Sequence, residues 1–83
     1  MAFSPSGIAI HPETNEIYIT SAKGSTLFII NKQKQLQEII FLNKKQLPQP
    51  EGICFDENSN LYISTEVKFG KGIIYKYLSL IHI

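Results

Sequence analysis

Residues 50–56 read PEGICFD, and residues 61–64 read LYIS. An earlier stretch has almost the same pattern, with PSGIAIH at residues 5–11 and IYIT at residues 17–20. Gly7 and Gly52 are 45 positions apart, whereas Tyr18 and Tyr62 are 44 apart. The loop between the glycine motif and the tyrosine motif is therefore one residue shorter in the second copy. Repeats of short strands with a period of about 40–50 residues are typical of β-propeller blades. The sequence therefore predicts an all-β fragment of a propeller.

Alternation of apolar and polar residues, punctuated by proline, asparagine and glycine, predicts the strands within each repeat. In the first repeat we expect strands at residues 7–10, 16–20, 25–31 and 36–42, and in the second at 52–55, 60–64 and 72–77. The later strands of the first repeat are apolar on both faces, as expected for a sheet stacked between two others. The predicted organisation is a four-stranded antiparallel blade at 5–42, a polar crossing at 43–51 and most of a second blade at 52–77.

The last six residues, LSLIHI at 78–83, have two interpretations. They could supply the native fourth strand of the second blade. They also resemble the translated adaptor sequence that is sometimes found at the ends of assembled reading frames, in which case they are not native. The sequence leaves both interpretations open.

Composition excludes several classes of function. Eight basic and seven acidic residues give a net charge of +1, too small to attract nucleic acid or an anionic membrane surface. A single cysteine excludes an internal disulfide and a cysteine-based metal cluster. No apolar run approaches the ~20 residues of a spanning helix. We therefore expect neither a nucleic-acid partner nor a membrane span in this segment.

The two motifs resemble a known family. PEGICFD followed by LYIS resembles the "PEGIA-hydrophobe-D … LY-hydrophobe-S" unit of the SdiA-regulated family of bacterial propeller proteins, and SGIAI followed by IYIT looks like the preceding unit. Similarity to NHL-repeat propellers and to the gluconolactonase and regucalcin group is weaker. The resemblance implies about six blades, so the missing blades of the same propeller are the first expected partners. It also implies a location in the bacterial cell envelope, membrane-anchored or periplasmic, and no established reaction.

Glu51 is the one candidate metal ligand. It precedes the innermost strand of a blade, which the propeller interpretation places near the mouth of the central channel. The gluconolactonase resemblance implies that a glutamate at the start of a blade helps to hold a divalent metal such as Ca²⁺, which needs several oxygen ligands. The counterpart in the first repeat, Ser6, has only a hydroxyl. The alternative is that Glu51 caps the turn or pairs with a lysine.

A second acidic motif is better explained as a turn. Residues 56–60 read DENSN, the opening of a calcium-loop pattern, but Leu61 stands where the pattern needs glycine and Val67 where it needs glutamate. We therefore predict a hairpin turn there. His11 occupies the position of Asp56 and is expected to be a turn residue, too far along the chain from His82 for a metal pair.

The remaining polar and aromatic candidates favour structural roles. Ser21 and Ser64 end their strands, but neither lies in a G-x-S-x-G elbow. Cys54 lies inside a strand and is expected to be a small buried hydrophobe. Tyr18 and Tyr62 occupy equal positions in the two repeats and are expected to pack between sheets.

Three functions remain open. The lack of a recognisable catalytic set favours a non-catalytic module that binds an unknown protein or small-molecule ligand. The alternative is a fragment of a metal-dependent, gluconolactonase-like hydrolase with Glu51 as one ligand, and the third is a purely structural repeat. In every case two blades leave apolar sheet faces uncovered, so the isolated chain is expected to be unstable or to self-associate.

Overall fold

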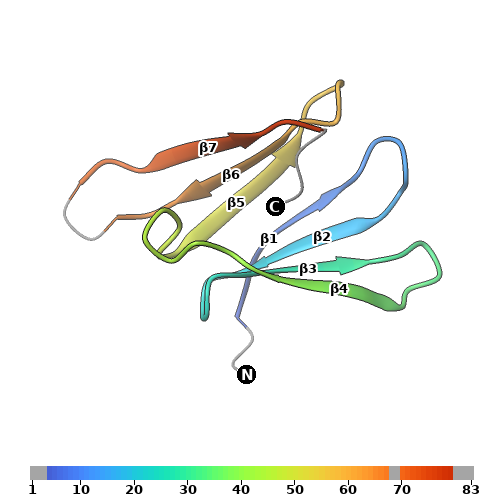
Figure 1. Cartoon of the computed structure of the whole chain (residues 1–83), viewed down its shortest axis with the longest axis horizontal. Coiled ribbons are helices and arrows are strands. Elements are labelled where there is room, and N and C mark those ends of the chain that lie inside the picture. Colours follow the sequence, from blue (N-terminus) through green and yellow to red (C-terminus); the bar gives the residue numbers. More distant parts are fainter. Residues whose placement is uncertain (1–3, 68–69, 80–83) are drawn as a thin grey trace.

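The computed structural model describes residues 4–67 and 70–79, and these residues form two antiparallel sheets without a helix (Figure 1). The first sheet has the order β1-β2-β3-β4 and the second the order β5-β6-β7. The strands are β1 (Pro5–Ile10), β2 (Ile17–Ser21), β3 (Thr26–Ile30), β4 (Leu36–Phe41), β5 (Pro50–Phe55), β6 (Leu61–Thr65) and β7 (Ile73–Tyr77). The all-β fold and all seven expected strands are confirmed, with boundaries that differ by at most two residues.

We call β1–β4 the first blade and β5–β7 the second blade. Leu78 and Ser79 follow β7 without continuing a strand, and the Ser79 N–H donates to Asn60 Oδ1 at 3.0 Å. Residues 80–83 of the doubtful tail, His82 included, lie outside the described residues.

The hairpin turns follow from residues that tolerate a left-handed backbone. Asn15, Lys34 and Ser59 have φ values of 63°, 66° and 64°, and each lies in a turn between two strands of one blade. Asparagine is favoured at such positions because its short side chain bonds locally to the backbone. These turns set the register in which Ile17 and Ile19 share one face of β2 while Tyr18 and Thr20 share the other.

In each blade, a backbone N–H just before the first strand donates to a hydroxyl at the end of the second strand. The N–H of Ser4 donates to Ser21 Oγ at 3.0 Å, and the N–H of Gln49 donates to Thr65 Oγ1 at 3.1 Å. The two contacts occupy equal positions in the repeat, so they show that the similarity of the two copies extends to side-chain hydrogen bonding. Burial of both hydroxyl-bearing residues makes the contacts part of the core.

The blades pack face to face and converge at the side where β1 lies beside β5 (Figure 1). β4 and β7 form the opposite, diverging edges of the two sheets. The buried core between the blades is apolar and comprises Leu27, Ile29, Leu42, Leu47, Leu61 and Ile63, with Tyr18, Ile40, Ile53, Phe55, Tyr75 and Tyr77 packed against it. This wedge, narrow at the first strands, is the arrangement of adjacent blades around a propeller axis.

The crossing between the blades is less polar than the sequence indicates. Leu42 and Leu47 are both buried in the shared core. The Leu47 N–H donates to the carbonyl oxygen of Asn43 at 2.7 Å, and the Leu47 carbonyl oxygen accepts a hydrogen bond from Ser25 Oγ. The crossing is therefore a tight turn anchored in the interface. Pro50 begins β5, a position where a strand tolerates the missing N–H.

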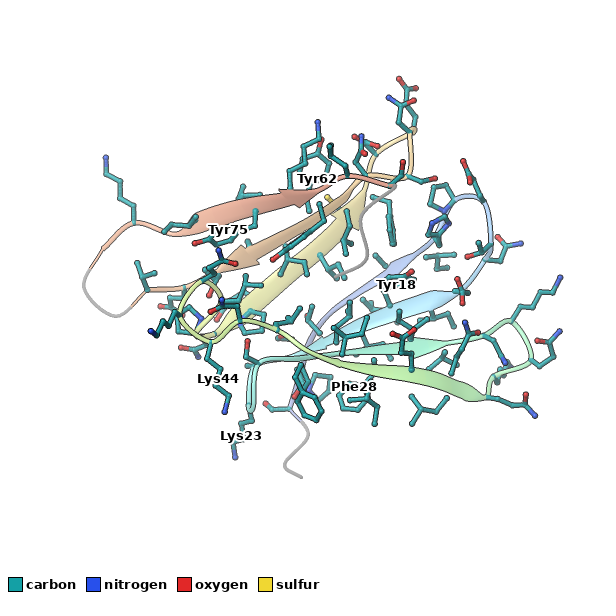
Figure 2. All side chains as sticks on the ribbon, viewed as in Figure 1. Tyr18, Lys23, Phe28, Lys44, Tyr62 and Tyr75 are labelled. Carbon is teal, nitrogen blue, oxygen red and sulfur yellow. The ribbon has the colours of Figure 1, made fainter. Side chains whose placement is uncertain are left out.

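The outer face of the first blade is apolar and uncovered, as expected when only two blades are present. Leu36 and Phe41 of β4 are 57% and 72% exposed, and Ile8 and Ile10 of β1 are 66% and 61% exposed. These side chains lie on the face of the first blade that points away from the second blade. Phe28 also lies on that side of β3 (Figure 2). A large apolar sheet face is therefore uncovered.

Candidate functional site

The converging edge of the two blades carries Ser6 and Glu51 at equal positions of the repeat. Each lies where the strand register shifts, between Pro5 and Gly7 in β1 and between Pro50 and Ile53 in β5. A bulge of this kind turns a side chain away from the regular alternation of the strand. Glu51 is the second residue of β5, the first strand of the second blade.

The Ser6 side chain links the two blades by a hydrogen bond. Its hydroxyl donates to the carbonyl oxygen of Pro50 at 2.7 Å and lies 3.0 Å from Thr20 Oγ1. Glu51, by contrast, is exposed, and its carboxylate has no hydrogen-bond or ion-pair partner among residues 4–67 and 70–79. The cap or lysine pair considered for Glu51 is not found in that part of the chain.

A calcium site does not assemble around Glu51 from the described residues. No group of three or more His, Cys, Asp or Glu side chains gathers anywhere in the described ranges. Ca²⁺ takes six to eight oxygen ligands, so one carboxylate is far from a complete site. Any such centre would need ligands from outside the described part of the chain.

The hollow between the blades is lined by aromatic rings and two carboxylates. It measures about 260 Å³ and is bordered by Glu16 and Glu38 of the first blade, among other residues. The rings of Tyr18 and Phe55 meet edge to face with centroids 4.9 Å apart, and His11 lies 4.9 Å from Phe55. Burial, together with the negative charges of Glu16 and Glu38, raises the pKa of Tyr18. Its phenol is therefore neutral at physiological pH and packs between the sheets, as expected.

The turn at residues 56–60 is a hairpin organised by one carboxylate, which confirms the hairpin prediction. Asp56 Oδ1 accepts the N–H groups of Asn58 and Asn60, both at 2.9 Å. Its Oδ2 accepts the side-chain amide of Asn60 and the hydroxyl of Tyr62, both at 3.0 Å. All four donors come from the turn and the strand after it. The carboxylate thus serves the turn rather than a cation.

His11 performs the same task in the first blade. Its Nδ1 accepts the N–H groups of Glu13 and Thr14, at 3.1 and 3.2 Å. The backbone of His11 closes the turn as Asp56 does, with its N–H donating to the Glu16 carbonyl oxygen at 2.8 Å. The expectation that His11 is a turn residue is confirmed.

We expect acid to destabilise the hairpin at residues 56–60, because the Asp56 carboxylate becomes protonated. Partial burial raises the pKa of this carboxyl, but the hydrogen bonds from Asn60, Tyr62 and Asn58 outweigh burial and lower it to about 2. In the unfolded chain the group titrates near 4. Its contribution to stability is thus present above pH ~4 and is lost as the pH falls through about 2.

We expect the melting temperature of the wild-type chain to fall more steeply between pH 4 and pH 2 than that of Asp56→Asn, which lacks the titrating group. Thermal unfolding followed by circular dichroism at several pH values measures the difference. Glu57→Gln, an exposed carboxylate in the same turn, is the matched control and should follow the wild type. Equal acid sensitivity of Asp56→Asn and the wild type would contradict the role of Asp56.

Two expectations fail on the other face of the second blade. Cys54 is exposed rather than buried. Tyr62 does not pack between the two sheets: it lies on the side of the second blade away from Tyr18 (Figure 2), with Lys76 Nζ 5.7 Å from its ring centroid. Both residues face the side where the described chain has no further sheet. They therefore lack the covering layer that their counterparts in the first blade have.

The two strand-ending serines bond to the backbone. Ser21 Oγ accepts the Ser4 N–H and donates to the Lys23 carbonyl oxygen at 3.0 Å. Ser64 Oγ accepts the N–H of Gly52 at 2.9 Å. The sequence analysis did not predict these hydrogen bonds between serine hydroxyls and the backbone. The available signal was the pair of Ser and Thr residues that ends the second strand in both repeats, at 20–21 and 64–65.

Comparison with known proteins identifies one family. The model of the SdiA-regulated family matches residues 4–69, well over half of the chain. No curated protein and no solved structure matches. Among the described residues no helix is long and apolar enough to cross a membrane.

Proposed function

This chain belongs to the SdiA-regulated family, and we propose that it is part of a non-catalytic binding propeller in the bacterial cell envelope. The observation that carries the proposal is the wedge between the blades, in which the first strands converge and Ser6 and Glu51 lie at the converging edge. In a propeller this edge borders the central channel, where such proteins commonly contact their ligands. Exposed Glu51 is the ligand-facing residue of this segment.

The alternative proposal is a metal-dependent, gluconolactonase-like hydrolase in which Glu51 is one ligand. The observation that favours it is the exposed Glu51 carboxylate, which has no partner in the described ranges. A hard cation there would need oxygen ligands from further blades. The two proposals differ in whether the channel needs a metal.

A calcium chloride titration of the full propeller that contains this segment distinguishes the proposals, because the other oxygen ligands of a metal centre would come from its further blades. For the binding module, we expect no saturable change at the backbone amide of Gly52, followed by NMR, up to about 1 mM, because one exposed carboxylate binds Ca²⁺ weakly. Glu51→Gln should then behave like the wild type. A saturable change that Glu51→Gln abolishes, while Glu57→Gln retains it, would favour the metal centre. Fractionation of the source cells with an antibody against the chain tests the envelope location, and recovery in the soluble cytoplasm would contradict it.

A further inference from the structure

The hollow between the blades lies at the opposite end of the strands from Glu51. Glu16 immediately precedes β2 and Phe55 ends β5, and both residues border the hollow, whereas Glu51 is near the start of β5. Because a strand rises about 3.3 Å per residue, Phe55 and Glu51 lie on the order of 13 Å apart. The hollow is therefore a site separate from the channel edge.

The hollow carries negative charge that the described residues do not neutralise. Glu16 is half-buried, and Glu38 of β4 borders the same hollow. Glu16 Oε1 accepts the hydroxyl of Thr14 at 2.8 Å, and neither carboxylate has an ion-pair partner among residues 4–67 and 70–79. No lysine of those ranges borders the hollow. A positively charged ligand would therefore find two carboxylates and no competing cation.

Aromatic rings form the apolar part of the hollow. The rings of Tyr18 and Phe55 meet edge to face with centroids 4.9 Å apart, and Tyr77 borders the hollow from β7. Tyr18 lies between the two sheets (Figure 2). The face of an aromatic ring attracts a cation within about 6 Å of its centroid, and proteins commonly bind quaternary ammonium groups among several such rings. The surroundings of the two carboxylates therefore suit an organic cation.

A metal ion fits the same surroundings poorly. Ca²⁺ takes six to eight oxygen ligands, and only two carboxylates border the hollow in the described chain. Aromatic rings supply none of the missing ligands. Size points to a small molecule, because the hollow measures about 260 Å³ and sites for drug-sized ligands span roughly 300–1,000 Å³.

One polar group beside the hollow has an unused hydrogen-bonding capacity. Ser59 borders the hollow from the turn between β5 and β6 and is 5% exposed. Its Oγ has no hydrogen-bond partner within the described part of the chain. A buried hydroxyl without a partner is unfavourable, so a ligand hydroxyl that bonds to Ser59 would relieve this cost.

We propose that this hollow binds a small organic cation, a quaternary ammonium compound that also carries a hydroxyl group. Its positive charge lies against the aromatic rings with Glu16 as counter-charge, and its hydroxyl bonds to Ser59. Glu16, Tyr18, Phe55 and Ser59 belong to the first two strands of each blade or to the turn that joins them. A further strand beside β7 would border the hollow next to Glu38 and leave these four residues in place.

The test compares choline with the neutral dimethylbutanol in which carbon replaces the ammonium nitrogen. Each compound is titrated at constant ionic strength into the full propeller that contains this segment, and the backbone amide of Ser59 is followed by NMR. We expect choline to bind saturably, with Kd on the order of 1 mM. The neutral compound should bind at least ~10-fold more weakly, because it lacks both the charge and the cation–π attraction. Tetramethylammonium, which lacks the hydroxyl, should bind roughly 2- to 12-fold more weakly than choline.

Variants test the residues assigned to the site. Glu16→Gln keeps an acceptor for Thr14 but removes the charge, so it should weaken choline binding roughly 2- to 5-fold. Glu13→Gln, an exposed carboxylate of the same turn that does not border the hollow, is the matched control and should bind like the wild type. Tyr18→Leu should weaken binding about 2- to 30-fold by removing a ring face. If it does not fold, Tyr77→Leu removes a second ring.

Several results would overturn the proposal. One is the absence of a saturable change up to ~50 mM choline, well above the expected Kd. Others are equal affinities for choline and its neutral analogue, and equal effects of Glu16→Gln and Glu13→Gln.

A choline group also occurs on phospholipids, and phosphocholine distinguishes the two sources. Repulsion between its phosphate and Glu16 should weaken binding if the ligand is the free ammonium alcohol, whereas undiminished binding would assign the hollow to a lipid headgroup. None of these outcomes bears on calcium at Glu51, so this proposal and the channel proposal fail independently.

Discussion

Replacing Leu47 with alanine is expected to lower the free energy of unfolding by about 2–5 kcal/mol. Leu47 is 0% exposed and lies in the core shared by the two blades, although it belongs to the crossing between them. Truncation leaves a cavity where the first and second blades meet. Each lost kcal/mol lowers the melting temperature of a domain this size by roughly 4–8 °C.

The cavity at Leu47 is difficult for the protein to close. The backbone of this residue is fixed on both sides, by its N–H to Asn43 and by its carbonyl oxygen to Ser25 Oγ. The chain therefore cannot collapse inward without breaking a buried hydrogen bond. A small fragment has little stability in reserve, so this single change should unfold much of the population at 37 °C.

Leu36→Ala is the matched control because it removes the same atoms from a leucine that is 57% exposed. Its effect should stay within about 0.5 kcal/mol. Urea unfolding at a protein concentration where both variants are monomeric measures the pair. Equal losses at Leu36 and Leu47 would show that the crossing does not anchor the blades.

Replacing Gly7 with alanine should destabilise the chain by about 1–3 kcal/mol by forcing the blades apart. An added Cβ would lie 2.9 Å from the Glu51 carbonyl oxygen, 3.0 Å from Thr20 Oγ1 and 3.1 Å from Ile53 Cγ2. The closest of these atoms belongs to the backbone of the other blade, which cannot rotate aside. Gly7 is therefore required for close approach rather than for an unusual backbone angle.

Gly52→Ala is the natural comparison because it changes the equivalent glycine. Its Cβ would meet only Ser64 Oγ, at 2.9 Å, and a serine side chain can rotate away. We expect a loss of stability below that of Gly7→Ala. Thermal unfolding of both variants gives the comparison. A larger loss of stability for Gly52→Ala would contradict the assignment of Gly7 to the blade contact.

Strands, turns and the repeat were predictable because they depend on residues close together in the chain. Because successive side chains of a strand point to opposite faces, the sequence alone showed which residues of β2 and β6 share a face. Proline, asparagine and aspartate predicted the polar turns at residues 11–16 and 56–60. Even the roles of His11 and Asp56 follow from local bonds, since every partner lies within six residues.

Burial was less predictable, because it depends on which surface lies opposite. Tyr18 and Tyr62 occupy the same position in their repeats, yet only Tyr18 is covered by a neighbouring blade. Cys54 has apolar neighbours in sequence and is nonetheless exposed. Leu47, in a stretch of lysines, glutamines and prolines, is fully buried. The sequence indicates which residues could be buried, and packing selects among them.

The sequence alone determined the blade pattern, its 45-residue period and the family to which the chain belongs. These are local properties, set by strand alternation, turn chemistry and the repeated motif. Only the tertiary structure decided that Ser6 joins the blades while Glu51 stays exposed, and that Ile53 seats against Gly7. Such contacts join residues more than forty positions apart, so they depend on how two sheets dock. Equal motifs have different roles here because each blade face acquires its role from the surface that covers it.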